Sequence, residues 1–142
     1  ADLFQRMNYQ VSVTRQTSDG GFDIRLRKND AGSIETSIVE CKRYTQNVPV
    51  KEMRALLGVV ERDGLTRGLL VTTAGFTRTT RLDASKTHRI ELIDFFALCV
   101  LLNEHFGLEW PRDIDRVLSN ARRQFEAEHN CSTEVAQESL TT

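Results

Sequence analysis

The chain has 142 residues and a formal net charge of −1 at pH 7, which predicts one domain with a single hydrophobic core. No apolar run approaches the ~20 residues of a membrane-spanning helix, no signal-peptide pattern opens the chain, and three scattered cysteines lack metal-ligand spacing. We therefore expect a cytoplasmic protein with no membrane contact, in which Cys41 and Cys99 are reduced core residues. Because the sequence has no initiating methionine, we interpret it as part of a longer chain.

The first third of the sequence predicts the end of a helix and then three strands. Apolar and polar residues alternate in the first two strands, which is the period of a strand with one buried face. The third is rich in β-branched residues, and the segment before it, with Gly32, has the composition of a turn. We expect a hairpin centred on Ala31 and Gly32. The expected elements are a helix end at 2–7 and strands at 9–14, 22–27 and 36–41.

Such a hairpin pairs residues whose numbers sum to 63, so Asp23 is expected opposite Glu40. Directly paired residues have Cβ atoms about 4.5–5.5 Å apart. Glu40 and Lys42 share a face because side chains alternate, whereas Cys41 points the other way. A register shift of one residue would move Asp23 to the opposite side of the sheet. The register therefore decides whether two carboxylates and one ammonium group can meet.

Two carboxylates this close repel each other unless a cation lies between them. Oxygen ligands with open water positions suit Mg²⁺ or Mn²⁺ rather than zinc. Such an ion polarises a phosphoryl oxygen and lowers the pKa of a bound water, while Lys42 would stabilise negative charge in the transition state. These are the requirements for phosphodiester hydrolysis. The same spacing also occurs on many solvated strand faces, so the surrounding sequence must decide.

The remaining elements predict an α/β organisation with a right-handed crossover. Pro49 is expected in the first turn of a helix, and Asp94 is expected to cap another. In the first helix, apolar residues with helical spacing are interpreted as core packing on the sheet: Met53, Leu56, Leu57 and Val60. The apolar surface of the second helix includes Phe95, Leu98, Leu101 and Leu102. The expected elements are helices at 49–62, 77–87, 94–105 and 111–128, and strands at 68–74 and 89–93.

The domain organisation follows from these elements. We expect a core at residues 1–107, a C-terminal helix at 108–128, and a polar, disordered tail at 129–142. The C-terminal helix has an apolar stripe of Ile114, Val117, Leu118, Ala121 and Phe125. Packing of this stripe on its own domain is favoured over a dimer contact.

Four motifs in a fixed order carry a family resemblance. They are Asp19-Gly20-Gly21-Phe22-Asp23, Glu40-Cys41-Lys42-Arg43-Tyr44, the run from Leu69 to Thr77, and Ile90-Glu91-Leu92-Ile93-Asp94. This series resembles the catalytic domain of Mrr-like restriction endonucleases, within the PD-(D/E)XK nuclease superfamily, over roughly residues 8–102. The resemblance implies a restriction-endonuclease-like three-layer core: a mixed central sheet of about five strands flanked by helices.

The resemblance also implies roles for individual residues. Asp23 matches the family's metal-binding aspartate, Glu40 the second metal ligand and Lys42 the catalytic lysine, and the Cys41 carbonyl is a candidate further ligand. Many Mrr-like proteins have glutamine at the position of Glu40, but glutamate is the superfamily's more general choice and leaves the chemistry intact. Asp19 is interpreted as a loop-shaping residue rather than a direct ligand.

Two segments are candidates for contacts with nucleic acid. In the first, Thr73 and Arg78 flank a loop whose backbone amides at a helix start would suit a phosphate. The alternative is a plain strand end and helix cap with Phe76 buried, and the sequence does not separate the two. In the second, Arg43 and Tyr44 follow the lysine and are expected to contact nucleic acid, and the alternative for Tyr44 is that it packs under this loop.

The predicted function is that of a Mg²⁺-dependent endonuclease domain that hydrolyses DNA phosphodiester bonds in a type II-like or modification-dependent restriction enzyme. Because a net charge of −1 gives little general attraction to DNA, we expect an additional DNA-recognition domain outside this sequence. The resemblance also implies a homodimer in which each copy cuts one strand. The alternatives are a structure-selective repair or junction nuclease, and an inactive DNA-binding or assembly module with the same fold.

Overall fold

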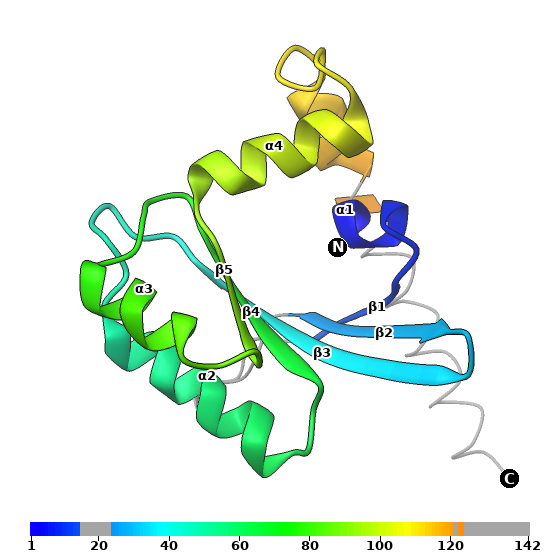
Figure 1. Ribbon diagram of the computed structural model, residues 1–142. Helices are drawn as coiled ribbons and strands as arrows, with labels where there is room; N and C mark the ends of the chain where they lie inside the picture. Colours follow the sequence, from blue (N-terminus) through cyan, green and yellow to red (C-terminus); the bar gives the residue numbers. More distant parts are fainter. Residues whose placement is uncertain (15–23, 121, 124–142) are drawn as a thin grey trace, which may run out of the picture.

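The computed structural model describes residues 1–14, 24–120 and 122–123, and its centre is a mixed sheet with strand order β1-β2-β3-β4-β5 (Figure 1). Strands β1 to β3 pair antiparallel, whereas β3, β4 and β5 pair parallel. The predicted mixed sheet of about five strands is therefore confirmed. The strands are β1 (Gln10–Val13), β2 (Ile24–Asp30), β3 (Ser33–Lys42), β4 (Arg67–Thr72) and β5 (Ile90–Ile93).

The β2–β3 hairpin has the predicted turn. Ala31 and Gly32 both have positive φ, 47° and 86°, as in the tight hairpin turns whose twist matches that of the strands. The register pairs Ile24 with Val39, and the pairing continues one residue at a time to Asp30 and Ser33. The residue numbers of each pair sum to 63, so the predicted register is confirmed along the described hairpin.

Helices cover both faces of the sheet, which gives the predicted three layers (Figure 1). Helices α2 and α3 lie on one face, and α1 and α4 lie on the other. Thr77 caps α3 by accepting the N–H of Thr80, and Asp94 caps α4 by accepting the N–H of Ala97, as predicted for Asp94. The helices are α1 (Asp2–Arg6), α2 (Val50–Arg62), α3 (Arg78–Ser85) and α4 (Phe95–Phe106). No described helix is long and apolar enough to cross a membrane.

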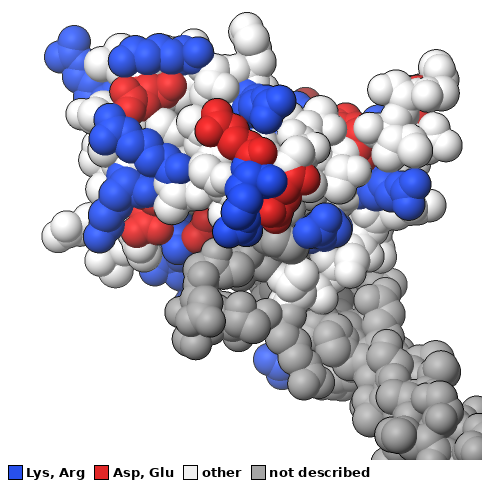
Figure 2. Space-filling view, turned by 90° about the horizontal axis from the view of Figure 1, so that it is seen from below, with Lys and Arg blue, Asp and Glu red and all other residues white. Residues whose placement is uncertain are grey.

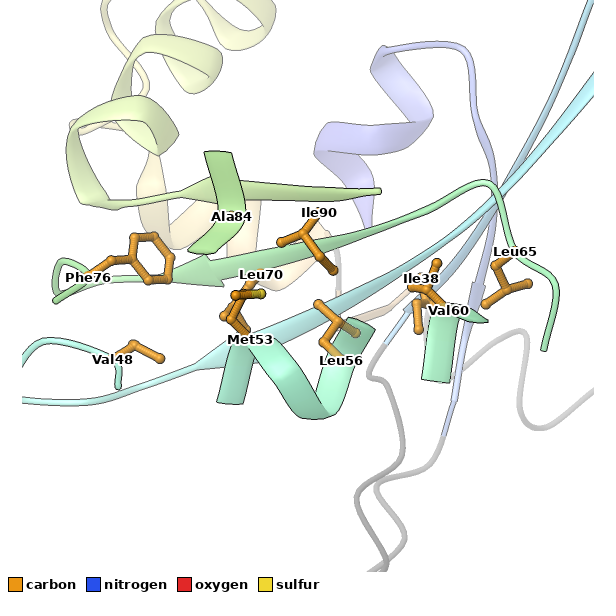
Figure 3. Packing of buried hydrophobic residues seen from close by; sticks show 10 residues of the cluster. All are labelled: Ile38, Val48, Met53, Leu56, Val60, Leu65, Leu70, Phe76, Ala84 and Ile90. Atoms are coloured by element: carbon orange, nitrogen blue, oxygen red, sulfur yellow. The ribbon is translucent and has the colours of Figure 1, made fainter. Parts of the chain in front are cut away.

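Each side of the sheet has its own hydrophobic cluster. Figure 3 shows Met53, Leu56 and Val60 of α2 packed towards Ile38 and Leu70 of the sheet. Burial of a side chain of this size contributes about 1.5–3 kcal/mol. The predicted stripe of α2 is therefore core, and Leu57 packs against the same cluster while partly buried. The second cluster contains Phe4, Ile24, Leu26, Val39, Leu69 and Ile93, with Leu98 and Leu101 of α4 against it.

One core prediction was wrong. Cys41 is exposed, near the carboxyl end of β3 and two residues beyond the buried Val39. Phe95 is 54% exposed because it begins α4 on the side away from the sheet, and Leu98 makes the contact instead. Cys99 is partly buried.

The C-terminal helix begins later than predicted. Residues 111–113 form turns, and the helix is regular from residue 114 to residue 120. Trp110, just before it, donates from Nε1 to Asn103 Oδ1 at 2.8 Å, and Leu118 is 59% exposed. The predicted tail from residue 129, together with Ala121 and Phe125, lies outside the described residues.

Candidate active site

The site forms where two parallel strands end side by side. The register of β3 and β4 places Lys42 next to Thr72, so both strands deliver their last residues to one edge of the sheet. The Thr72 hydroxyl donates to the Lys42 carbonyl oxygen at 2.8 Å and accepts the N–H of Ala74 at 3.1 Å. Thr72 is only 1% exposed. A buried hydroxyl therefore fixes the backbone of Lys42.

Glu40 and Lys42 project from the same face of β3, as predicted. Lys42 Nζ lies 2.6 Å from Glu40 Oε1. It also lies 3.2 Å from Oε2 of Glu52, the third residue of α2. The three side chains are 23%, 13% and 18% exposed, in the order Lys42, Glu40 and Glu52. The lysine is thus held between a carboxylate of the sheet and a carboxylate of the helix that covers it.

Glu52 was not predicted from the sequence. An acidic residue in the first turn of a helix is ordinary, because it interacts favourably with the helix dipole. The sequence held only an indirect indication. The helix was expected to pack on the sheet through Met53, so Glu52, which precedes Met53, had to lie at the edge of that contact. The Tyr44 hydroxyl donates to Glu52 Oε1 at 3.1 Å. Tyr44 therefore belongs to the network around Lys42.

These contacts determine the ionisation of the site. Partial burial by itself lowers the pKa of Lys42, but hydrogen bonds to Glu40 and Glu52 and the charges of both carboxylates outweigh it and raise the pKa well above the ordinary value. Lys42 is therefore a cation at neutral pH. Partial burial and the hydrogen bond to Glu52 likewise raise the pKa of Tyr44, so its hydroxyl is a proton donor in this network.

The loops that follow β3 and β4 are bonded to each other. The N–H of Val48 donates to the Gly75 carbonyl at 2.8 Å, and the Val48 carbonyl accepts the N–H of Thr77 at 3.2 Å. Gly75 allows this close approach, because a Cβ there would lie 2.9 Å from Asn47 Oδ1. Phe76 is 4% exposed. These features match the interpretation of this loop as a strand end followed by a helix cap, with Phe76 buried.

The other predicted site residues are distributed around this edge of the sheet. Thr73 and Arg78 are exposed at the second loop, and Arg43 is exposed directly after Lys42. Tyr44 is 38% exposed. Asp19 and Asp23 lie outside the described residues. Within the described ranges, no three or more His, Cys, Asp or Glu residues cluster in a way that could hold a metal ion.

Charges of both signs alternate on the face that α2 and α3 cover (Figure 2). Asp83 pairs with Arg54 at 2.6 Å and with Lys86 at 3.3 Å. Asp94 pairs with Arg81 at 2.9 Å. Several basic residues near the second loop are therefore neutralised by neighbouring carboxylates, and they do not form a continuous basic surface.

The sequence profile of the Mrr_cat family, described as restriction endonuclease, matches residues 1–102. The chain belongs to the Mrr-type restriction endonuclease family. A curated relative is the type IV methyl-directed restriction enzyme EcoKMrr of Escherichia coli (strain K12). The two sequences are 32% identical over an alignment of 109 residues, and the match covers 73% of this chain and 36% of the relative. The Mrr-type chain thus spans about a third of the length of that enzyme.

Solved structures support the Mrr-type fold. The DNA modification-dependent restriction endonuclease AspBHI superposes with a TM-score of 0.70 at 24% identity, covering 87% of this chain and 34% of AspBHI. The MspJI restriction endonuclease, solved in complex with a 27-mer oligonucleotide, gives a TM-score of 0.63 at 19% identity. That match covers 84% of this chain and 28% of MspJI. The restriction-endonuclease-like core expected from the sequence is confirmed.

Proposed function

We propose that this chain is the cleavage domain of a Mg²⁺-dependent endonuclease that hydrolyses DNA phosphodiester bonds in a restriction system. The observation that carries the proposal is the placement of Lys42 Nζ 2.6 Å from Glu40, at the carboxyl end of β3 in a Mrr-type domain. A lysine ammonium and a carboxylate separated by one residue on a strand are suited to act together on one phosphate.

We infer that Asp23 and Glu40 are the metal ligands, with the Cys41 carbonyl oxygen as a further one. The register of β2 and β3, continued by one pair beyond Ile24 and Val39, would pair Asp23 with Glu40. Carboxylate and carbonyl oxygens are donors that fit Mg²⁺, for which Mn²⁺ would substitute. A bound Mg²⁺ would polarise a phosphoryl oxygen and lower the pKa of a bound water.

The chain's own residues supply the other parts of the chemistry. Lys42 is protonated, so it donates hydrogen bonds and positive charge to the phosphate oxygens, where negative charge grows in the transition state. Exposed Arg43, Thr73 and Arg78 would contact the phosphates on either side of the cleaved bond.

The proposal is tested by incubating supercoiled plasmid with the wild type, Asp23→Asn and Lys42→Ala in Mg²⁺, and with the wild type in EDTA. We expect nicking by the wild type in Mg²⁺ only, and loss of about 10²-fold or more in rate for each variant. Glu61→Gln, an exposed carboxylate at the other end of α2, is the matched control. Equal nicking by all variants would refute the assignment.

Two alternatives from the sequence are tested in the same assay. A junction nuclease would prefer branched over linear DNA, and an inactive binding module would bind DNA without cutting it. Restriction is favoured because the curated relative is a methyl-directed restriction enzyme. We also propose a homodimer that cuts both strands, and recognition of sequence or modification by a further domain, which the near-neutral charge of this chain supports.

A further inference from the structure

Glu52 uses both carboxylate oxygens within the site. Oε1 accepts a hydrogen bond from Tyr44 at 3.1 Å, and Oε2 lies 3.2 Å from Lys42 Nζ. Its side chain is 18% exposed, and it lies in the first turn of α2, where the helix dipole favours a negative charge. A carboxylate that is fixed on both sides has one orientation, and that orientation points at the lysine.

Lys42 needs an anchor that does not also take part in metal binding. A lysine carries its charge on a flexible four-carbon chain, so its ammonium is positioned only by the groups that it contacts. Its shorter contact, 2.6 Å, is to Glu40, the residue proposed to bind the metal. A carboxylate that coordinates a metal interacts less strongly with a neighbouring ammonium. Glu52 is the remaining contact from a different element.

We propose that Glu52 is a positioning residue for the cleavage reaction: it holds the Lys42 ammonium in place and is itself oriented by the Tyr44 hydroxyl. The inference rests on the proposed function, because it assigns Glu52 a role through the proposed catalytic lysine. A role for Glu52 as a metal ligand is less consistent with the geometry. Both of its carboxylate oxygens already have a partner, Oε1 the Tyr44 hydroxyl and Oε2 the Lys42 ammonium.

The test measures steady-state cleavage, kcat and KM, by Glu52→Ala and Glu52→Gln, with Glu61→Gln as the matched control on the same helix. Misplacement of a catalytic group by about 1 Å costs about 10²-fold in rate, so we expect kcat to fall by about that factor in Glu52→Ala. We expect Glu52→Gln to recover part of the loss because its amide oxygen still accepts from Lys42. The KM for DNA and the Mg²⁺ concentration for half-maximal rate should stay within about twofold of wild type, since a positioning role does not alter binding.

A double-mutant cycle tests whether Tyr44 acts through Glu52. Tyr44→Phe removes the hydrogen bond that orients Glu52, so kcat should fall about fivefold in the wild-type background. In the Glu52→Ala background the same change should have no effect, because the hydroxyl then has nothing to orient. If the losses in kcat from Tyr44→Phe and Glu52→Ala multiply in the double variant, Tyr44 does not act through Glu52, and the proposed order of contacts is overturned.

The outcomes separate this inference from the proposed function. If Lys42→Ala cleaves like the wild type, the proposed catalytic site itself is refuted. If Lys42→Ala is inactive while both Glu52 variants retain wild-type kcat, only the positioning role is overturned. Rescue of the Glu52 variants by high Mg²⁺ would make Glu52 a metal ligand and would also overturn it. Thermal unfolding identifies a misfolded Glu52→Ala, in which case the isosteric Glu52→Gln decides.

Discussion

Asp94 combines two stabilising contacts in a single carboxylate. Oδ1 accepts the N–H of Ala97 at 2.9 Å and caps α4, while Oδ2 lies 2.9 Å from an Arg81 nitrogen. Replacing a capping aspartate by alanine costs about 0.5–2 kcal/mol. We therefore expect Asp94→Ala to lower the free energy of unfolding by about this amount in urea titrations, and Asp94→Asn, which keeps the cap, to lower it less.

The same residue predicts a pH dependence. The backbone hydrogen bond from Ala97, followed by the contact with Arg81, lowers the pKa of Asp94 from its ordinary value of 3.8. A depressed folded pKa contributes stability that is present above the unfolded value and is lost as the pH falls through the folded value. The difference in free energy of unfolding between the wild type and Asp94→Asn should therefore be full at pH 7 and shrink below pH ~4. A constant difference at all pH values would contradict the assignment.

At the residue scale, the sequence predicted what depends on neighbours along the chain. Alternation along a strand was enough to place Glu40 and Lys42 on one face. It was not enough to find Glu52, whose position depends on how the loop after β3 returns α2 over the strand. The exposure of Cys41 depends similarly on what packs over the end of β3, which no local pattern encodes.

The contact between α2 and β4 predicts opposite effects for two glycine substitutions. A Cβ at Gly68 would lie 2.9 Å from both Leu56 Cγ and Val60 Cγ2, and overpacking of this kind costs about 1–3 kcal/mol. Gly58, within α2, has open space around it, and glycine in a helix is about 0.5–1 kcal/mol less stable than alanine. Gly68→Ala should therefore destabilise the protein and Gly58→Ala should stabilise it. Chemical denaturation measures the sign of the stability change for each variant. An unchanged denaturation midpoint for Gly68→Ala would exclude the close packing.

The junction of β3 and β4 depends on a buried hydroxyl. Thr72→Val keeps the shape of the side chain but leaves the Lys42 carbonyl and the Ala74 N–H without this partner. An unsatisfied buried polar group costs about 1–3 kcal/mol, so we expect that loss of stability in thermal or urea unfolding. Thr72→Ser retains the hydroxyl and should lose less. Equal stability of the two variants would mean that the hydroxyl does not hold the strands together.

At the element scale, the hairpin was the most predictable feature. Turn residues and period-two alternation specify both the turn at Ala31 and Gly32 and the register that follows from it. Helix surfaces were harder to predict, because α4 is apolar on most sides and its sequence does not indicate which side meets the sheet. Of the apolar surface expected for this helix, Leu98 and Leu101 pack against the sheet, whereas Phe95 is exposed.

The charge of the whole molecule limits how it can bind DNA. With a net charge of −1 and ion pairs over the α2 and α3 face, the contact with DNA that we propose for this chain would depend on exposed cations near the site. Each phosphate neutralised contributes about 0.9 to the slope of log K against log salt concentration. Arg43→Ala should reduce that slope by about this amount in fluorescence titrations with duplex DNA. Arg62→Ala, at the far end of α2 and paired with Asp63, should leave it unchanged, and equal slopes for both variants would place DNA elsewhere.

Anomalous diffraction from a crystal soaked in Mn²⁺ would locate the divalent metal that we propose at the carboxyl end of β3, beside Lys42. We predict one strong peak about 2.0–2.2 Å from a Glu40 carboxylate oxygen and an Asp23 carboxylate oxygen, with Lys42 close by. A saturated crystal with no peak at Glu40, or with the side chains of Asp23 and Glu40 turned away from each other, would contradict the account.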